Sequence, residues 1–316
     1  MKNYILKFIH LIDIPLAGII WLPAYILKIY RKIGSKKLKI CTKVLKWIGV
    51  MPIRDHYYEP LFLPEVLKKD LREERVLPGI DLNKNRQLEL LNKLNYDQEF
   101  IEIVDKSHFN IDNNSFVAGD AEFLYQFIRY LKPSKVIEVG SGNSTIITHL
   151  ALDYNKKHDG KFSEHICIEP FEQPWLEEYK NIRLYRNKLE DINDNFDWKN
   201  ELCEGDLLFI DSSHIIRPQG DVLTEYLSIL PSLNKGVYVH VHDIFTPRDY
   251  LNEWLFKDAY FWNEQYLLEA LLSNSDRYEV VASLNWLKYN YYEKLKEVTP
   301  YLNVDSEPGS FYLRIN

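Results

Sequence analysis

The chain has 316 residues, 46% of them hydrophobic, so it can bury a substantial core and is not a disordered protein. Its net charge of −7 is unevenly distributed. Residues 1–50 carry +9, from ten basic and one acidic side chain, and the rest of the chain carries −16, from 29 basic and 45 acidic side chains. The acidic body argues against nucleic acid as the main partner. Three widely spaced cysteines argue against a disulfide framework and favour a reducing, cytoplasmic location.

The N-terminal segment, residues 1–50, combines an apolar stretch with basic flanks. Residues 14–27 are fourteen positions without a charge, fewer than the ~20 that cross a bilayer as a straight helix. Pro15 and Pro23 are expected to break or kink this stretch. Residues 35–48 have helical apolar spacing among lysines, which predicts an amphipathic helix suited to an anionic membrane surface. We expect peripheral or monotopic attachment to the inner face of the membrane. The alternative is a helical extension packed on the body or on a second subunit.

The remaining chain is predicted to contain a helical connector and a nucleotide-binding domain. Residues 51–118 form the connector, which could cap a substrate, and residues 119–316 form the domain. Gly119 and Asp120 open an amphipathic helix that runs to Leu131.

A glycine turn follows that helix, in the sequence KVIEVGSGNST at residues 135–145. Residues 136–139 are typical of a short buried parallel strand. Gly140 and Gly142 allow a sharp turn that brings backbone N–H groups close to a ligand. Ser144 and Thr145 are N-cap candidates for the next helix. Strand, turn and helix together predict a nucleotide-type site at the carboxyl edge of an α/β sheet.

Further strands follow at regular intervals. We expect them at residues 165–169, 182–185, 207–210, 236–243, 278–284 and 311–315. This order predicts a doubly wound, mostly parallel, seven-stranded sheet with an antiparallel edge. Glu169 ends the second strand, where a carboxylate can accept hydrogen bonds from ribose hydroxyls; a surface acid is the alternative. Glu190 lies in the loop where an adenine would bind.

Acids and histidines gather after the fourth and fifth strands. Asp211 and His214 follow one strand, and His242 and Asp243 end the other, at the edge where open α/β sheets bind ligands. His214 could act as a general base. Asp211 and Asp243, with His242, could hold a divalent cation that acidifies a substrate hydroxyl. The structural alternative is that Asp211 caps a helix and the histidines are satisfied strand-end residues.

An aromatic segment, residues 245–272, follows the fifth strand. Arg248 and Tyr250 precede its helix and are candidates to contact an acceptor. Trp262 and Tyr266 have helical spacing, which favours packing on the sheet.

The motifs VIEVGSGNST, CIEP, LLFIDSSH and VHVHDIF resemble those of class I S-adenosylmethionine-dependent methyltransferases. The resemblance covers residues 119–316 and implies a Rossmann-like fold with S-adenosylmethionine as cofactor. Thr145 stands where dinucleotide enzymes carry a third glycine, which disfavours an oxidoreductase. The cofactor-binding residues implied are Glu138, Gly140, Ser141, Gly142, Ser144, Glu169, Glu190 and Asp120, the last closing over the methionine end.

The acid and histidine pattern also resembles metal-dependent sugar O-methyltransferases of the macrocin type. That resemblance implies that Asp211 and Asp243 bind magnesium and that His214 is the base. Ile244 departs from the pattern, and a site using His242 would suit a transition metal. We therefore expect O-methylation of a sugar, glycolipid or other small acceptor, with a homo-oligomer possible. The alternatives are a metal-dependent hydroxylase resembling cephalosporin hydroxylase, and a membrane-docked nucleotide-binding protein without catalysis.

Overall fold

The computed structural model describes residues 2–54, 56, 58–61, 63, 66–113, 115–171, 173–179 and 181–316, with side chains from Ile12 onward. It divides into two compact units, Met1–Asp70 and Leu71–Asn316. The sequence predicts boundaries at residues 50 and 118. Much of the expected connector instead belongs to the second unit, because Leu90, Leu91 and Phe100 share a core with the helix that begins at Asp120.

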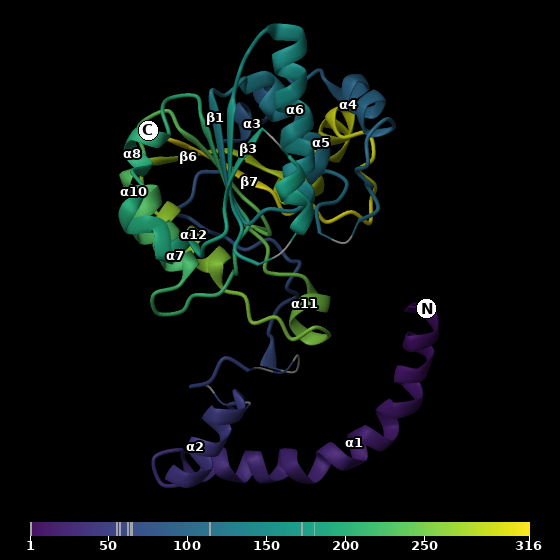
Figure 1. Ribbon diagram of the computed structural model, residues 1–316, viewed down its shortest axis with the longest axis vertical. Coiled ribbons are helices and arrows are strands. Elements are labelled where there is room, and N and C mark those ends of the chain that lie inside the picture. Colours follow the sequence, from purple (N-terminus) through teal and green to yellow (C-terminus); the bar gives the residue numbers. More distant parts are fainter. Residues whose placement is uncertain are drawn as a thin grey trace. The chain divides into compact units, whose positions relative to one another are not determined.

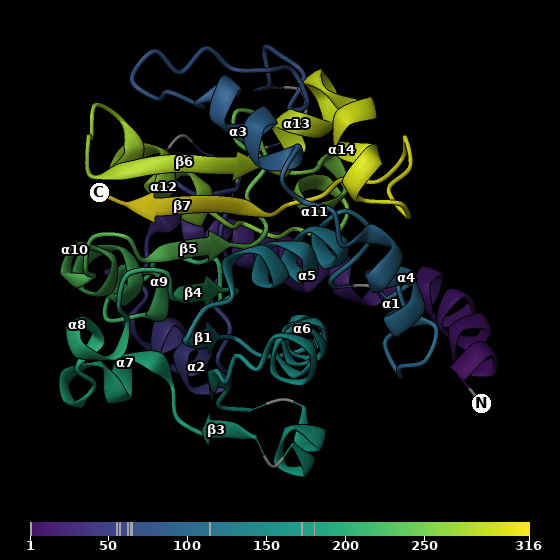
Figure 2. The same ribbon diagram turned by 90° about the horizontal axis from the view of Figure 1, so that it is seen from above.

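The second unit is built on a seven-stranded sheet in the order β3-β2-β1-β4-β5-β7-β6 (Figure 2). The strands are β1 (Lys135–Val139), β2 (Glu164–Ile168), β3 (Ile182–Tyr185), β4 (Leu207–Ile210), β5 (Tyr238–Val241), β6 (Tyr278–Ser283) and β7 (Phe311–Ile315). The doubly wound, mostly parallel α/β fold is confirmed. The expected antiparallel edge is present, because β7 is antiparallel to both β5 and the edge strand β6.

Helices surround this sheet (Figure 1). They are α3 (Lys84–Leu91), α4 (Asp97–Val104), α5 (Asp120–Leu131), α6 (Asn143–Asp159), α7 (Leu189–Ile192), α8 (Trp198–Glu201), α9 (Asp221–Thr224), α10 (Leu230–Ser232), α11 (Asn252–Phe256), α12 (Glu264–Leu272), α13 (Leu284–Asn290) and α14 (Tyr292–Val298). A π-helical turn, η4 (Glu225–Ile229), joins α9 to α10, and short 3₁₀ turns occupy η2 (Pro174–Glu178) and η3 (Asn193–Asn195).

Two hydrophobic cores cover the two faces of the sheet. Val136 of β1 and Phe209 of β4 belong to the core that contains α5 and α6. Ile137 and Ile210 belong to the other core, with α9, α10 and α12. Since successive strand residues point to opposite faces, this alternation also fixes the face on which each polar strand residue lies.

The helix after the glycine turn begins earlier than predicted. Gly142 is the N-cap of α6, and its N–H donates to the Thr145 hydroxyl at 3.0 Å. The prediction of Ser144 or Thr145 as the N-cap was therefore wrong. The hydroxyl of Thr145 still satisfies a free backbone donor, but from a position inside the first turn.

The first unit contains α1 (Lys2–Ile33) and α2 (Lys39–Ile48). Figure 1 shows α1 as one continuous, curved helix, so of the expected break or kink at Pro15 and Pro23 the break does not occur. A proline removes one backbone donor and bends a helix, but the remaining hydrogen bonds can continue it. Within α1, residues 12–33 are long and apolar enough to cross a membrane, a property shared by cleaved signal sequences.

Candidate active site

The glycine turn is held by contact between the ends of β1 and β4. Gly140 has a φ of +81°, and a Cβ there would overlap the carbonyl oxygen of Asp211 and lie 2.8 Å from its carbonyl carbon. Only glycine fits this position. Gly142 has extended backbone, and a Cβ there would meet only the Gln173 Nε2 atom at 4.0 Å. The steric requirement for glycine in this structure is therefore at Gly140.

A cleft of about 440 Å³ opens beside this turn, at the carboxyl ends of the parallel strands. It brings together four predicted site residues, Gly140, Glu169, Glu190 and Asp211. The Glu169 carboxylate, 9% exposed, accepts hydrogen bonds from the backbone N–H groups of Ser141 at 3.2 Å and Phe171 at 2.9 Å. This acid is therefore fixed against the glycine turn.

Glu138 lies away from the cleft, on the face covered by α6. Its buried carboxylate accepts hydrogen bonds from the Thr148 hydroxyl at 3.2 Å and the Cys167 thiol at 3.4 Å, and lies 2.9 Å from His165 Nε2. The alternation of β1 places this side chain opposite Val139, which lines the cleft. The structure thus gives Glu138 a buried hydrogen-bonded role rather than the predicted cleft-lining one.

Three other residues that were predicted to bind the cofactor do not line the cleft. Ser141 and Ser144 are 7% and 3% exposed. Asp120 is 1% exposed, and its carboxylate accepts hydrogen bonds from the backbone N–H groups of Gly309 at 3.1 Å and Ser310 at 2.8 Å. Asp120 therefore ties the start of α5 to the segment before β7.

The predicted acid and histidine cluster does assemble. The Nε2 atom of His214 lies 3.4 Å from Asp211 Oδ1 and 3.5 Å from Asp243 Oδ2. The Nδ1 atom of His242 lies 3.5 Å from Asp211 Oδ1 and 3.4 Å from Asp243 Oδ1. Both imidazoles thus face the same two carboxylates.

His242 is enclosed by acids. Its Nε2 atom lies 3.6 Å from Asp120, and the residue is 3% exposed. Among the described residues, neither of its ring nitrogens has a hydrogen-bond partner. Buried polar groups are usually hydrogen-bonded, so the ring nitrogens of His242 are available to bind a metal ion or another ligand at this site.

Two cluster residues adopt left-handed backbone conformations, with φ of 59° at His214 and 58° at Asp243. This region is uncommon for residues other than glycine and often marks functional sites. Its effect here is to turn both side chains toward each other at the ends of two neighbouring strands.

Sequence reasoning missed Glu264, the first residue of α12. Its fully buried carboxylate lies 2.8 Å from His214 Nδ1 and accepts a hydrogen bond from the Tyr226 hydroxyl at 3.0 Å. Tyr226 is placed by the π-helical turn η4. Trp262 packs against the His214 ring, with centroids 4.3 Å apart, although its spacing had favoured a role in packing on the sheet. An acid at a helix start is ordinary in sequence, so nothing in the pattern distinguished Glu264.

The charges of the cluster perturb its ionisation. Burial alone would lower the pKa of His214, but Asp211 and Glu264 raise it well above its ordinary value. Burial would raise the pKa of Asp211, but His242 and His214 hold it below its ordinary value. Burial raises the pKa of Asp243 to about 6, against the opposing effect of the two histidines. Such perturbation by burial and specific partners is typical of functional sites.

Residues 137–244, which contain the glycine turn, the cleft-lining acids and the cluster, match the model of the family described as a methyltransferase domain. This match supports the class I methyltransferase superfamily expected from the motifs, whose members depend on S-adenosylmethionine.

Similar proteins are known from sequence and structure. An uncharacterized protein from Archaeoglobus fulgidus is 28% identical over 184 residues, which are 52% of this chain and 81% of that protein. The O-methyltransferase TomG from Streptomyces achromogenes, solved with SAM, is 14% identical, with 72% and 90% of the two chains covered and a TM-score of 0.41. The methyltransferase MycE, solved with Mg, SAH and mycinamycin VI, is 12% identical, with 68% and 54% covered and a TM-score of 0.38.

The predicted acceptor residues of the methyltransferase domain are packed. Tyr250 is 1% exposed, and its hydroxyl accepts a hydrogen bond from the Gln265 N–H at 3.0 Å. Arg248 is 7% exposed, and its guanidinium lies 3.9 Å from the centre of the Tyr289 ring. Both residues stabilise the aromatic segment after β5 in this structure.

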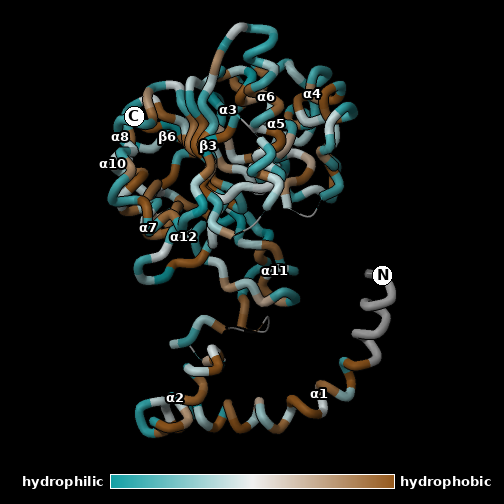
Figure 3. Tube along the Cα trace, in the orientation of Figure 1, coloured by the Kyte–Doolittle hydropathy of each residue, from teal (hydrophilic) through white to brown (hydrophobic). Residues whose placement is uncertain are grey.

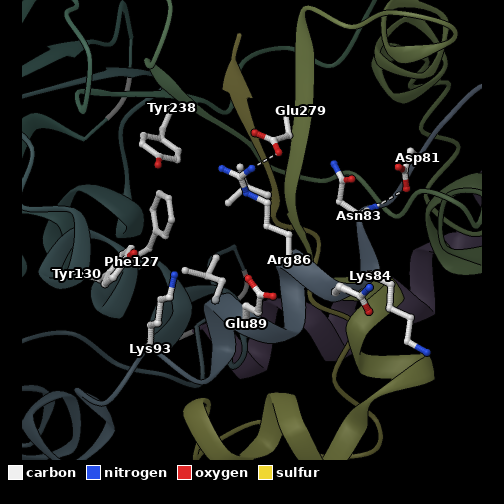
Figure 4. A pocket seen from close by; sticks show the side chains of 13 residues that line it. Asp81, Asn83, Lys84, Arg86, Glu89, Lys93, Phe127, Tyr130, Tyr238 and Glu279 are labelled. Carbon is white, nitrogen blue, oxygen red and sulfur yellow. Dashed lines mark hydrogen bonds and ion pairs between the residues drawn. The ribbon is translucent and has the colours of Figure 1, made fainter.

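A second cavity, of about 680 Å³ and so larger than the cleft beside Gly140, lies elsewhere on the second unit (Figure 4). Its lining includes Tyr238, the first residue of β5, and Glu279, near the start of β6. Figure 4 shows the ion pair between Arg86 and Glu279 on one side, with Phe127 and Tyr130 across from it. It therefore opens toward the amino ends of β5 and β6, opposite the edge where the acid and histidine cluster lies. Size alone does not select the reactive site here.

The cluster has a donor set that fits a divalent cation. Asp211, His214 and Asp243 each offer one ligand atom, and these atoms lie within 4.8 Å of one another. Carboxylate oxygens suit magnesium or manganese, and an imidazole nitrogen adds affinity for transition metals. The carboxylate of Glu264 on the far nitrogen of His214 matches the outer support that metal-binding histidines usually have.

Proposed function

We propose that the protein transfers a methyl group from S-adenosylmethionine to a hydroxyl oxygen of a sugar, glycolipid or other small acceptor. One observation carries this proposal: Asp211 belongs both to the lining of the cleft and to the acid and histidine cluster. A cofactor in the cleft would thus lie next to the groups that can activate a hydroxyl.

The cleft supplies groups suited to the nucleoside part of this cofactor. Glu169 stands at the carboxyl end of β2, where its oxygens can accept hydrogen bonds from ribose hydroxyls. Gly140 leaves the chain free of a side chain at the turn. Glu190 lines the same cleft, and its carboxylate accepts a hydrogen bond from Arg217 at 3.1 Å.

His214 is the proposed base. A carboxylate only accepts hydrogen bonds, so the contact with Glu264 places a proton on Nδ1. In the neutral imidazole, the lone pair of Nε2 then faces the cluster. In the reaction, Nε2 takes the proton of the acceptor hydroxyl as the O–C bond forms and the C–S bond of the sulfonium breaks. Glu264 is a positioning residue, because it orients the ring and stabilises the imidazolium that results.

Asp211 and Asp243 are the proposed cation ligands, with His242 available as a nitrogen donor. A bound divalent cation would lower the pKa of the acceptor hydroxyl and hold its oxygen in place. It would also offset the negative charge that otherwise keeps the imidazoles protonated.

The first test is calorimetric titration of the purified protein with S-adenosylhomocysteine, with and without a chelator, followed by methyl transfer from labelled cofactor to a panel of hydroxyl acceptors. We expect micromolar binding that survives the chelator, and turnover that depends on His214. His214→Asn should abolish turnover while leaving the affinity for S-adenosylhomocysteine within about twofold. No binding in either condition would refute the proposal, and binding without turnover on any acceptor would favour a non-catalytic nucleotide-binding protein.

A second candidate function is a metal-dependent hydroxylase on the same fold. The observation that favours it is the presence of two histidines, His214 and His242, around Asp211, since two imidazoles and one carboxylate are the donors typical of non-haem iron oxygenases. Metal analysis of the purified protein separates the two enzymes. Stoichiometric iron with oxygen consumption would favour the hydroxylase, and methyl transfer supported by magnesium or manganese would exclude it.

A further inference from the structure

From Ile12 onward, helix α1 exposes apolar side chains on every side. Ile14, Ile19 and Ile20 are 82%, 69% and 51% exposed. At about 100° per residue, these three positions point in three directions spread around the helix axis. Trp21 and Tyr25 add further exposed aromatic surface. Figure 3 shows hydrophobic colour along the described part of α1.

This distribution differs from that of an amphipathic helix. A helix that packs on a protein surface buries one apolar stripe and turns polar residues outward. A helix that is apolar on all sides needs an environment that encloses it, either a protein core or the hydrocarbon of a membrane. In the most apolar 18-residue stretch of the described segment Ile12–Ile33, no residue is buried. The hydrocarbon of a membrane is therefore the environment that fits this part of α1.

Helix α2 has the complementary pattern. Ile40, Val44 and Trp47 fall on one side at helical spacing and are 80%, 48% and 87% exposed. Its lysines occupy another side, at positions 39, 43 and 46. This amphipathic pattern suits the interface between lipid headgroups and hydrocarbon, with basic residues facing anionic lipid.

The two helices are joined in a way that places these features together. The hydroxyls of Tyr30 and Thr42 lie 2.6 Å apart and link the end of α1 to α2. Lys28, Arg31 and Lys32 lie near the same end of α1. Positive charge next to an apolar helix favours the cytoplasmic side of a membrane.

We propose that α1 inserts into the hydrocarbon of an anionic bilayer as an integral anchor, with α2 lying at the cytoplasmic surface. The segment from Ile12 to Ile33 has 22 residues, about 33 Å of helix against a hydrocarbon thickness of ~30 Å. This anchoring is stronger than the peripheral or monotopic attachment expected from the sequence, because a helix that crosses the hydrocarbon buries apolar surface along its whole length. It does not depend on the proposed methyl transfer.

Extraction of the full-length protein from membranes tests the anchor. We expect it to remain in the membrane pellet in 1 M sodium chloride and in alkaline carbonate, and to be released by detergent. Release by salt would show a peripheral attachment and overturn the proposal. A detergent-free soluble oligomer would show that a second copy covers α1. An intact mass lacking α1 would show a cleaved signal sequence, and either of these results would also overturn the proposal.

Flotation with vesicles of phosphatidylcholine and phosphatidylglycerol tests each helix separately. The double variant Ile19→Asp/Leu22→Asp should lose binding in high salt. Its matched control, Leu227→Asp/Val304→Asp, makes the same kind of change at equally exposed positions of the second unit and should float like the wild type. Equal flotation of both variants would refute insertion of α1.

Neutralising the lysines of α2 tests the surface contact. In the Ile19→Asp/Leu22→Asp background, which lacks the inserted helix, replacing all three with glutamine should weaken binding to anionic vesicles by about fivefold per lysine and leave binding to neutral vesicles unchanged. An unchanged preference for anionic lipid would refute the placement of α2. Binding of S-adenosylhomocysteine by every variant reports on the second unit, so a folding defect there is distinguished from loss of the anchor.

Discussion

Replacing Gly140 with alanine should be among the most damaging single changes in the methyltransferase domain. The residue has a φ of +81°, a conformation that costs an alanine roughly 1–2 kcal/mol. The new Cβ would also overlap the Asp211 carbonyl, whose strand is tied to β1 by the Asp211 N–H to Val139 carbonyl hydrogen bond of 2.8 Å. Relieving the overlap means moving one strand end and weakening that bond, so the free energy of unfolding should fall by roughly 3–6 kcal/mol.

Two other glycines separate the causes of that loss. Gly205 has a φ of +87° with no heavy atom within 4 Å of a built Cβ, so Gly205→Ala isolates the backbone cost, roughly 1 kcal/mol. Gly142 has extended backbone and open space, so Gly142→Ala should change stability by less than about 1 kcal/mol.

Urea denaturation and calorimetry with S-adenosylhomocysteine measure the three variants side by side. Gly140→Ala should lose both stability and ligand binding. Gly142→Ala should stay folded but bind at least tenfold more weakly, because its methyl group would stand where the ligand approaches the turn. If Gly140→Ala is no less stable than Gly205→Ala, the reasoning from the Asp211 contact is refuted.

Three further predictions concern side chains. Glu264→Gln should lower turnover by about 10–100-fold while the affinity for S-adenosylhomocysteine stays the same; loss of both together would mean that Glu264 is only structural. The raised pKa of His214 means that its stabilising interaction is complete below about pH 6.5 and is lost as pH rises through the folded-state value. His214→Asn is the matched variant, because asparagine tolerates the left-handed φ of 59° at this position. The difference in free energy of unfolding between the metal-free wild type and this variant should therefore shrink toward alkaline pH. A constant difference would contradict the assigned direction of the pKa shift. Burial raises the pKa of the Cys167 thiol, so detergent-solubilised native protein should show two reactive thiols, Cys41 and Cys203, and a third only after unfolding; three native thiols would be inconsistent with the buried position.

The parts of the fold that could be predicted are those set by local patterns. The seven strands follow from short apolar runs, and the cluster follows from the rule that the carboxyl ends of parallel strands share one edge of a sheet. The sequence therefore predicts that Asp211, His214 and Asp243 lie close together, and they do. Their left-handed conformations were not predictable, because they depend on contacts that the surrounding loops impose.

Other features depend on contacts between distant segments. Glu264 lies 50 residues from His214, and only the tertiary fold brings the two together. The face on which Glu138 lies was decided by the alternation of β1, which a motif comparison does not consider. The continuity of α1 through Pro15 and Pro23 shows that a proline lowers helix stability without always ending the helix.

Asp211 connects the two halves of the site through two different parts of the same residue. Its backbone carbonyl packs against Gly140 and so fixes the turn beside the cleft. Its carboxylate lies 3.4 Å from His214 and 3.5 Å from His242 in the cluster. A shift of β4 would therefore move the turn and the cluster together. Because the backbone contact is independent of the side chain, a substitution at Asp211 can alter the chemistry of the cluster while the turn at Gly140 is retained.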